Sequence, residues 1–290
     1  MGEIAVTLAS DQEARACLAL LPEARDAPAE LLIARRGRAF AGAAALLWQS
    51  GATPAGFPTA IHVVPEQRRQ GVGRELLGAA ADLAAEETIG LWSMTPVAEQ
   101  SDAARFMYAC GCVPKRRERH FEAAVDALLD VVAPKADRMR ARGHVPNDLR
   151  IQGLADAPLE EVGWVVSSGL GGDQGATLSA LRRRAPGGSE HAGDRSSLVI
   201  REGRVWGVIL WRVVDGVGVV DARVVHATCR GAWPNVVLLE AGLRRARDEG
   251  VSRFRFHCDD TVRDTLSLAR RCAAVETETK ATWYYAIAAD

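Results

Sequence analysis

The chain has 290 residues, of which 36 are basic and 37 acidic, and its formal net charge is −1. This balance excludes a strong field over the whole surface that would attract nucleic acid or an anionic membrane. The length predicts two domains rather than one. The first residues show no basic segment followed by an apolar core, and no run of about 18 apolar residues occurs further on. We therefore expect a soluble, cytoplasmic protein.

The first half alternates strand and helix signals. Its predicted elements are a strand at Ile4–Leu8, a helix at Asp11–Leu21 begun by an Asp cap, a hairpin at Leu31–Trp48, a strand at Ala60–Val64, a helix at Gly73–Glu87, a strand at Ile89–Met94, a helix at Gln100–Ala109 and a strand at Val113–Val125. A helix with a charged far end follows at Ala127–Arg142, and Gly143 ends it. The sequence thus predicts domains at residues 1–126 and 148–290, joined by a helical linker at 127–147.

The second half repeats the order of the first. It predicts a strand at Leu149–Gly153, a helix at Leu159–Ser168, a mobile Gly/Arg/Ser-rich stretch at Gly187–Ser196, a hairpin at Val199–Val214, a strand at Gly218–Val225, a helix at Val236–Glu249, a strand at Arg253–Cys258, a helix at Thr261–Arg271 and a strand at Thr282–Ala288. Two halves with one order of elements indicate an internal duplication. A gapless alignment that sets Val64 beside Val225 places Ala232 on Gly71 and Pro234 on Gly73. The fold class is therefore α/β, with two similar mixed, mostly antiparallel sheets flanked by helices.

The segment Val63–Ala80 reads VVPEQRRQGVGRELLGAA and joins a predicted strand to a predicted helix. Unpaired amides at a helix start, together with the helix dipole, form an anion site, and glycines let the backbone approach the anion closely. Arg68, Arg69 and Arg74 add positive charge for phosphate oxygens. This composition suits a pyrophosphate.

Two other phosphate motifs fail here. A Walker loop needs a lysine and a hydroxyl residue after its last glycine, and Arg74-Glu75 follow Gly73 instead. A dinucleotide motif needs a third glycine where Leu76 stands. An ordinary solvated turn remains the alternative.

The run from Val63 to Leu77 closely resembles the acyl-CoA-binding motif of the GCN5-related N-acetyltransferases (GNATs), and the order of elements over residues 1 to 126 is similar to that fold. The second half resembles a degenerate copy, so the whole resembles tandem-domain members. The resemblance implies acetyl-CoA as co-substrate, with its pyrophosphate on the backbone amides of the loop and its pantetheine beside a strand that splays from its neighbour. The implied cofactor-binding residues are Ile61, His62, Val63, Arg68, Arg69, Gln70, Gly71, Val72, Gly73 and Arg74. An N–H near Val63 is expected to stabilise the oxyanion.

Candidate catalytic residues are Tyr108 and His62. Family members often carry a tyrosine acid in Phe-Tyr-x-x-x-Gly-Phe, but here Met107 stands at that position and Tyr108 follows it. Because one residue is a rotation of about 100° on a helix, Tyr108 is either a shifted acid or a packed residue. His62 is either a general base on the strand beside the acyl group or a histidine packed against a helix.

Other polar residues leave alternatives open. Glu99 and Asp102 are candidates for contacting a cationic substrate or for capping the next helix. His120 lies either on a solvated strand edge or near the 3′-phosphate of the cofactor. Five of the seven tryptophans fall in the second half, where they wall a ligand pocket or fill a core: Trp164, Trp206, Trp211, Trp233 and Trp283.

The sequence thus predicts an acetyl-CoA-dependent N-acetyltransferase that acts on a small-molecule amine by direct attack in a ternary complex. The six scattered cysteines predict neither a metal site nor a disulfide framework. The alternatives are a non-catalytic acyl-CoA sensor or scaffold and a transferase of longer acyl groups. No nucleic-acid or membrane partner is expected, and the oligomeric state stays open, with a homodimer as one alternative.

Overall fold

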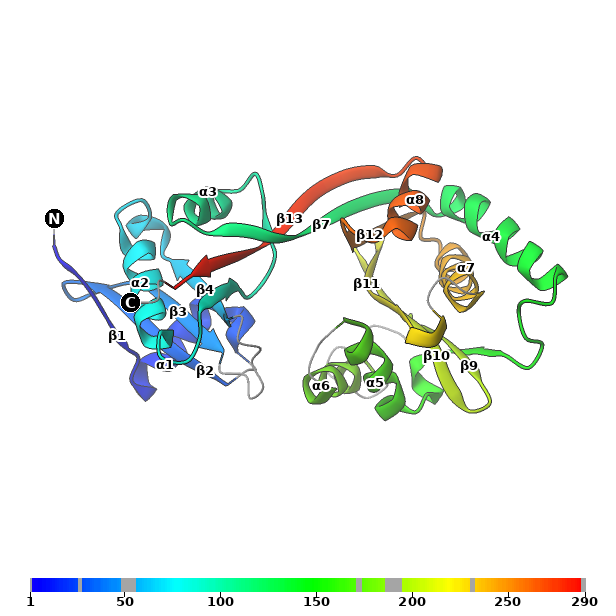
Figure 1. The fold of residues 1–290 in the computed structure, drawn as a ribbon, viewed down its shortest axis with the longest axis horizontal. Helices are drawn as coiled ribbons and strands as arrows, with labels where there is room; N and C mark the ends of the chain where they lie inside the picture. The colour runs from blue at the N-terminus through cyan, green and yellow to red at the C-terminus, as the bar shows by residue number, and fades with distance from the viewer. Residues whose placement is uncertain are drawn as a thin grey trace. The chain divides into compact units, whose positions relative to one another are not determined.

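The computed structural model describes residues 2–25, 28–47, 56–170, 174–185, 195–229 and 233–287. The chain divides into two compact units, one made of Met1–Glu118 with Thr279–Asp290 and the other of Arg119–Glu278 (Figure 1). Each unit has a mixed sheet flanked by helices, which confirms the predicted fold class. None of the described helices is long and apolar enough to span a lipid bilayer.

The first unit begins with a strand, a helix and a hairpin, as predicted. Its elements are β1 (Ile4–Leu8), α1 (Asp11–Leu20), η1 (Pro22–Ala24), β2 (Ala29–Arg36), β3 (Ala39–Leu47), β4 (Phe57–Val63), η2 (Pro65–Gln67), α2 (Val72–Ala84), β5 (Gly90–Ser93), β6 (Val97–Ala98), α3 (Asp102–Ala109) and the start of β7 (Val113–Ala124). The N-cap of α1 is Ser10, where an Asp cap was expected. The Glu13 carboxylate accepts from the Ser10 amide at 2.8 Å, which fixes this helix start.

Two apolar layers cover the sheet of the first unit. Because successive side chains of a strand point to opposite faces, the alanine-rich β3 can contribute to both layers. On one face, α2 and α3 pack over a core that includes Ala44, Leu46 and Leu76. On the other face, α1 and η1 pack against Ala43, Ala45 and Ala60. The small alanines let helices approach both sides of this strand.

The second unit repeats this plan. Its elements are the end of β7, α4 (Val125–Ala141), β8 (Arg150–Gln152), η3 (Leu154–Asp156), α5 (Leu159–Leu170), α6 (Gln174–Arg184), β9 (Ser197–Arg201), β10 (Arg204–Val214), β11 (Val217–Val225), η4 (Ala227–Cys229), α7 (Trp233–Asp248), β12 (Arg253–Asp259), α8 (Arg263–Arg271) and the start of β13 (Val275–Ala286). The arginine-rich α6 was not predicted, because only Leu181 of its side chains is buried. Most of the stretch expected to be mobile, residues 187–194, lies outside the described residues.

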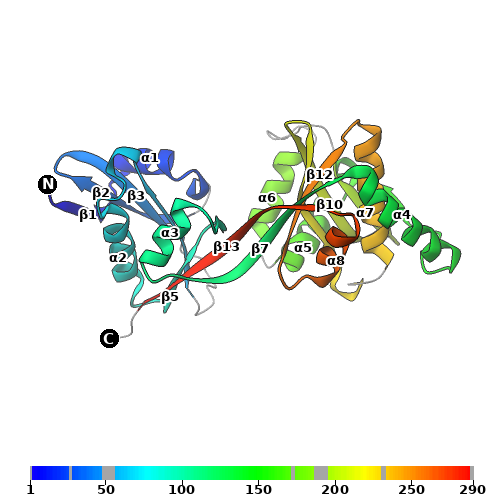
Figure 2. The same cartoon turned by 90° about the horizontal axis from the view of Figure 1, so that it is seen from above.

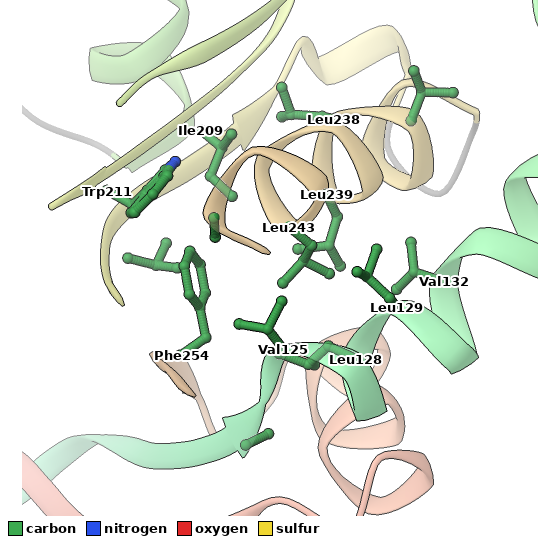
Figure 3. Close-up of a cluster of buried hydrophobic side chains, with 14 of the residues drawn as sticks. Val125, Leu128, Leu129, Val132, Ile209, Trp211, Leu238, Leu239, Leu243 and Phe254 are labelled. Atoms are coloured by element: carbon green, nitrogen blue, oxygen red, sulfur yellow. The ribbon is translucent and has the colours of Figure 1, made fainter. Parts of the chain in front are cut away.

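The core of the second unit forms where α4 and α7 pack together over the sheet. Figure 3 shows Val125, Leu128 and Leu129 of α4 facing Leu239 and Leu243 of α7. The predicted linker helix is therefore part of this unit, because its apolar face is buried in the unit's own core.

The two units exchange strands. In the first unit, the sheet continues from β5 to residues 279–286 of β13 and then to residues 113–118 of β7. In the second unit, the sheet continues from β12 to residues 119–124 of β7 and then to residues 275–278 of β13. The views in Figures 1 and 2 both show β7 and β13 running side by side. The compact units therefore differ from the expected bounds of 1–126 and 148–290, because the last strand of the chain completes the first sheet.

Matched strand pairings support the internal duplication. Gly42 pairs with Val63 in the first unit, and Gly207 pairs with Val225 in the second. Val225 therefore matches Val63 and not Val64. The β-bulge between Leu210 and Trp211 skips Asp221 in the opposite strand, which accounts for the one-residue difference from the gapless alignment.

The exchanged strand generates a stability prediction. Trp283 of β13 is only 1% exposed and packs in the core beneath α2. We expect Trp283→Ala to destabilise the first unit by about 3–5 kcal/mol, because a large buried side chain leaves a cavity. Urea unfolding, combined with hydrogen exchange of the α2 amides, measures this loss. Trp164→Ala, at a side chain that is 45% exposed in the second unit, is the control and should leave α2 exchange unchanged.

Candidate functional site

The first unit contains a cavity of about 1000 Å³ at the ends of β4 and β5. Its walls come from the end of β4, the loop before α2, the residues after β5, and α3. Of the predicted cofactor-binding residues, the cavity is lined by Ile61, His62, Val63, Arg68, Arg69, Gly71, Gly73 and Arg74. Gln70 and Val72 are not among its lining residues. The structure therefore brings most of the predicted set together.

The cavity opens where two parallel strands part. Pairing of β4 with β5 ends at Thr59 and Ser93, and the Met94 amide donates to the Thr59 carbonyl at 2.9 Å. On its other edge β4 stays paired with β3 as far as Val63. The Thr59 carbonyl points toward β5, and backbone directions alternate along a strand, so the N–H and C=O groups of Ile61 and Val63 point into the opening. The predicted splay is present in the structure.

The loop before α2 presents amides at its far side. Gly71 is the N-cap and has φ +91°, in the left-handed region that glycine adopts most easily. The Arg74 amide donates to the Gly71 carbonyl at 2.9 Å, whereas the amides of Val72 and Gly73 donate to no acceptor in the described part of the chain. Unpaired amides and the helix dipole at the start of α2 are features that favour an anion.

Backbone strain and close packing also mark this loop. Arg69 has φ +58°, a conformation that costs an L-residue roughly 1–2 kcal/mol. A side chain at Gly73 would begin 3.0 Å from the Phe106 ring of α3. Arg69 therefore holds a strained backbone conformation and Gly73 leaves no room for a side chain without a shift of Phe106. Strained backbone is common at binding sites.

The three loop arginines play different parts. The Arg68 Nε donates to the Val63 carbonyl at 3.1 Å, so this guanidinium satisfies one backbone group of the opening. The Arg69 side chain is 85% exposed and lies 3.8 Å from Asp102. Arg74 lies beside the Cys110 thiol. All three place positive charge around the cavity.

Arg36 of β2 holds the loop from outside the motif. Its guanidinium donates to the Gln70 carbonyl at 2.8 Å and also bonds the Gln70 side-chain oxygen. The Gln70 amide group donates in turn to the Glu66 carbonyl at 2.8 Å. Gln70 therefore holds the loop in place without lining the cavity. Sequence reasoning missed Arg36 because it lies on the hairpin, and only the sheet brings it to the loop.

His62 forms a pair with a carboxylate that the sequence did not suggest. Its Nε2 lies 2.9 Å from the Glu23 Oε1 of η1, and both residues line the cavity. His62 is the more exposed of the two, with 45% of its side chain accessible against 19% for Glu23. It is on the α1 face of β4, opposite to Val63, so it is not packed against α2. The pair thus places an imidazole nitrogen and a carboxylate that orients it at the wall of the cavity.

Tyr108 is not brought to the cavity. Its ring packs edge-on against Trp283, with 4.5 Å between ring centroids, while the preceding Met107 lines the cavity. The rotation between neighbouring helix positions puts the two side chains on different sides of α3. The geometry therefore gives no support to Tyr108 as a proton donor.

The cysteines near the cavity are poorly suited to nucleophilic attack. Burial raises the pKa of the Cys110 thiol, with Arg74 acting in the opposite direction. Burial, together with the neighbouring Cys110, raises the pKa of Cys112 to about 11. Because thiolate is the reactive form, neither thiol is activated at neutral pH.

The remaining polar candidates have structural partners. Ser101 is the N-cap of α3, and its hydroxyl accepts from the Ala104 amide at 3.2 Å. Glu99 accepts from the Arg117 Nε at 2.6 Å, and Asp102 pairs with Arg105. The capping alternative is therefore wrong for both acids, and of the two Asp102 lines the cavity.

His120 lies outside the first unit altogether. It belongs to the second unit and stacks on His257, with 5.1 Å between ring centroids. The described residues contain no cluster of His, Cys, Asp and Glu that could hold a metal ion.

The second unit has a different set of residues at the matching place. Pairing of β11 with β12 is confined to Gly218–Phe254 and Val219–Arg255, so these strands part as well. Arg223, at the position that matches Ile61, donates to the Thr265 hydroxyl of α8 at 2.7 Å. Burial lowers the pKa of this guanidinium, and the nearby Cys258 and Asp264 oppose that shift. Pro234 stands in the first turn of α7, where it supplies no amide donor. Arg230 and Ala232 lie outside the described residues.

Comparison with known proteins agrees with these observations. Residues 5–112 match the model of the acetyltransferase (GNAT) family. A search of curated protein sequences gave no match. Among solved structures, a tandem GNAT protein from the clavulanic acid biosynthesis pathway is similar over 99% of this chain and 100% of its own, with a TM-score of 0.63 and 17% identity.

Two further structures share the fold. A GCN5-related N-acetyltransferase from Sphaerobacter thermophilus is similar over 99% of this chain and 96% of its own, with a TM-score of 0.60 and 15% identity. A GCN5-related glucosamine N-acetyltransferase region of a fungal multi-domain β-N-acetylglucosaminidase covers 98% of this chain and 38% of its own, with a TM-score of 0.65 and 11% identity. Residues 5–112 therefore form a domain that matches the GNAT family, and the whole chain shares the fold of a tandem GNAT protein.

Proposed function

We propose that the first unit transfers an acetyl group from acetyl-CoA to the amine of a small molecule, by direct attack within a ternary complex. The observation that carries this proposal is the meeting of three features in one cavity: the open backbone edge at Ile61 and Val63, the amides at the start of α2, and the His62–Glu23 pair. The match of residues 5–112 to the GNAT family supports acyl-CoA as the donor.

The donor binds along the line from α2 to the opening. Its pyrophosphate accepts from the amides of Val72 and Gly73, with Arg69 and Arg74 supplying charge. Its pantetheine amide pairs with the backbone edge of β4 and replaces the Arg68 guanidinium at the Val63 carbonyl. The released Arg68 then becomes a further phosphate ligand. This exchange satisfies the buried backbone groups that the parted strands leave open.

The acceptor amine enters from the α1 face of β4. His62, oriented by Glu23, takes a proton from the ammonium group, and the freed nitrogen lone pair attacks the thioester carbonyl. The Val63 N–H stabilises the resulting oxyanion, and the C–S bond then breaks. The thiolate leaves without a dedicated acid, because a thiol with a pKa near 8.5 is a fair leaving group.

The second unit, in this proposal, holds no CoA. Pro234 removes a donor from the first turn of α7, and the Arg223 side chain spans from β11 to α8 beside the parted strands, so the second unit offers a phosphate fewer backbone donors.

Acetyl-CoA binding tests the anion site. We expect acetyl-CoA to raise the melting temperature of the wild type, by an amount equivalent to about 2.7 kcal/mol at 100 times its Kd. Gly71→Pro should lose most of this shift, because proline cannot adopt φ +91°. Gly216→Pro, also at a positive φ but in the hairpin turn between β10 and β11 of the second unit, is the matched control and should keep the shift. An equal shift in the Gly71 variant would contradict the site.

The base is tested on an amine panel, with release of CoA thiol as the readout. We expect His62→Gln to lower kcat/KM by about 100-fold and Glu23→Gln to lower it by about tenfold. The deficit should shrink at high pH, where the amine arrives already deprotonated. Acetyl-CoA binding should stay unchanged in both variants. A loss that is constant across pH would argue for a structural role, and wild-type binding without any turnover would favour a sensor.

Tyr108→Phe should leave kcat/KM within about twofold of the wild type, because the hydroxyl does not reach the cavity. The same thiol-release measurement decides this point. A drop of about 100-fold would restore Tyr108 as the acid.

A further inference from the structure

We propose that the second unit binds a small zwitterion whose cationic end is a methylated ammonium group. A cavity of about 470 Å³ lies between the first turns of α5, the start of β10 and the residues after β11. Trp164, Trp206 and His226 form its aromatic walls, and Glu161 and Arg204 line it with opposite charges. All of these residues belong to the second unit, so the proposal does not depend on acetyl transfer in the first.

The aromatic walls lie at the margin of the apolar core, against which Trp206 is partly packed. Trp211 is 3% exposed and Trp283 is 1% exposed, whereas Trp164 keeps 45% of its surface accessible. The Trp164 ring lies 5.4 Å from the His226 ring, tilted by 35°, and the Trp206 ring lies 6.5 Å from it. Trp206 in turn stacks on Trp233 at 6.4 Å. Trp211 and Trp283 are therefore core residues, whereas Trp164 and Trp206 line this cavity and Trp233 packs behind Trp206.

The two charges on the cavity do not neutralise each other. One Glu161 oxygen accepts from the Val205 amide at 3.0 Å, which fixes the carboxylate at the cavity wall. Within the described ranges, neither Glu161 nor Arg204 makes an ion pair. A ligand that carries both an anionic and a cationic group would satisfy both side chains at once.

The ring faces indicate which cation suits the site. A cation over a tryptophan face is attracted by the negative face of the ring, and quaternary ammonium groups are bound in this way by aromatic cages. A primary ammonium has three N–H donors to satisfy. The side chains lining the cavity offer few free acceptors, since one Glu161 oxygen is taken and the Thr228 hydroxyl is bonded to the His226 Nδ1 at 2.8 Å. A methylated ammonium, which has fewer donors or none, is the better fit.

The site stands at a place where the two units diverge. In the first unit the Val64 amide donates to the Ala41 carbonyl, and in the second the His226 amide donates to the Trp206 carbonyl. Ala41 and Val64 are thus matched by Trp206 and His226. Trp233 begins α7 as Val72 begins α2. Beside the helix start that lost a phosphate donor, small side chains have been replaced by aromatic rings.

Three matched probes test the proposal by calorimetry and tryptophan fluorescence on the full chain. Glycine betaine carries both charges, choline lacks the carboxylate, and 3,3-dimethylbutanoate replaces the cationic nitrogen by carbon. We expect glycine betaine to bind with a Kd near or below about 1 mM and each of the other two to bind at least about tenfold more weakly. No saturation by glycine betaine at about 10 mM, or equal binding of the butanoate, overturns the proposal.

Variants then locate the site. Glu161→Gln keeps an oxygen for the Val205 amide but loses the charge, and it should weaken glycine betaine by about tenfold, as should Trp164→Leu. Glu160→Gln is the matched control, since Glu160 is exposed and faces Arg182 at 3.5 Å, and it should bind as the wild type does. Unchanged binding in both site variants overturns the location. If a variant fails to fold, the comparison of the three probes on the wild type still decides.

Discussion

The parting of β4 from β5 beyond Thr59 and Ser93 is the constraint on which the first unit depends. A parallel pair that ends early leaves the N–H and C=O groups of Ile61 and Val63 facing an opening, and buried backbone groups of this kind require a partner. In this structure the Arg68 guanidinium meets one of them. An extended ligand with its own amide would meet them better, and the start of α2 stands ready for the anionic end of that ligand. The position of the cavity, its charge and its shape all follow from where one strand pairing stops.

The strands β7 and β13 each contribute residues to both units, so the folding of the two halves of the chain is coupled. Residues 279–286 lie between β5 and β7 in the first unit, so the sheet of this unit is complete only once the last strand of the chain has paired. Trp283 contributes a buried ring to the same core that supports α2. The anion site in the first unit therefore rests on residues from the far end of the sequence.

The second unit shows how one scaffold carries different surfaces. Its strands part at the matching place, but an arginine spans from β11 to α8 and a proline stands at the helix start. Tryptophans and a histidine stand near the position of the phosphate loop. Retaining the sheet register while exchanging the side chains at its edges is a simple route from one ligand chemistry to another, because the backbone geometry that makes a cavity is conserved by the fold itself.

The sequence alone determined the class of fold, the duplication and the loop at Gly71, because strand and helix periods, glycines and arginines act locally and are visible in a single pass along the chain. It also placed Ile61 and Val63 at the opening. Only the tertiary structure decided which side of α3 Tyr108 occupies, which carboxylate meets His62, how Arg36 holds Gln70, and to which sheet the last strand belongs. Each of these depends on residues far apart in sequence that pack together only in the folded chain. A one-residue rotation on a helix or a one-residue bulge in a strand moves a side chain to another face, and no local pattern records it.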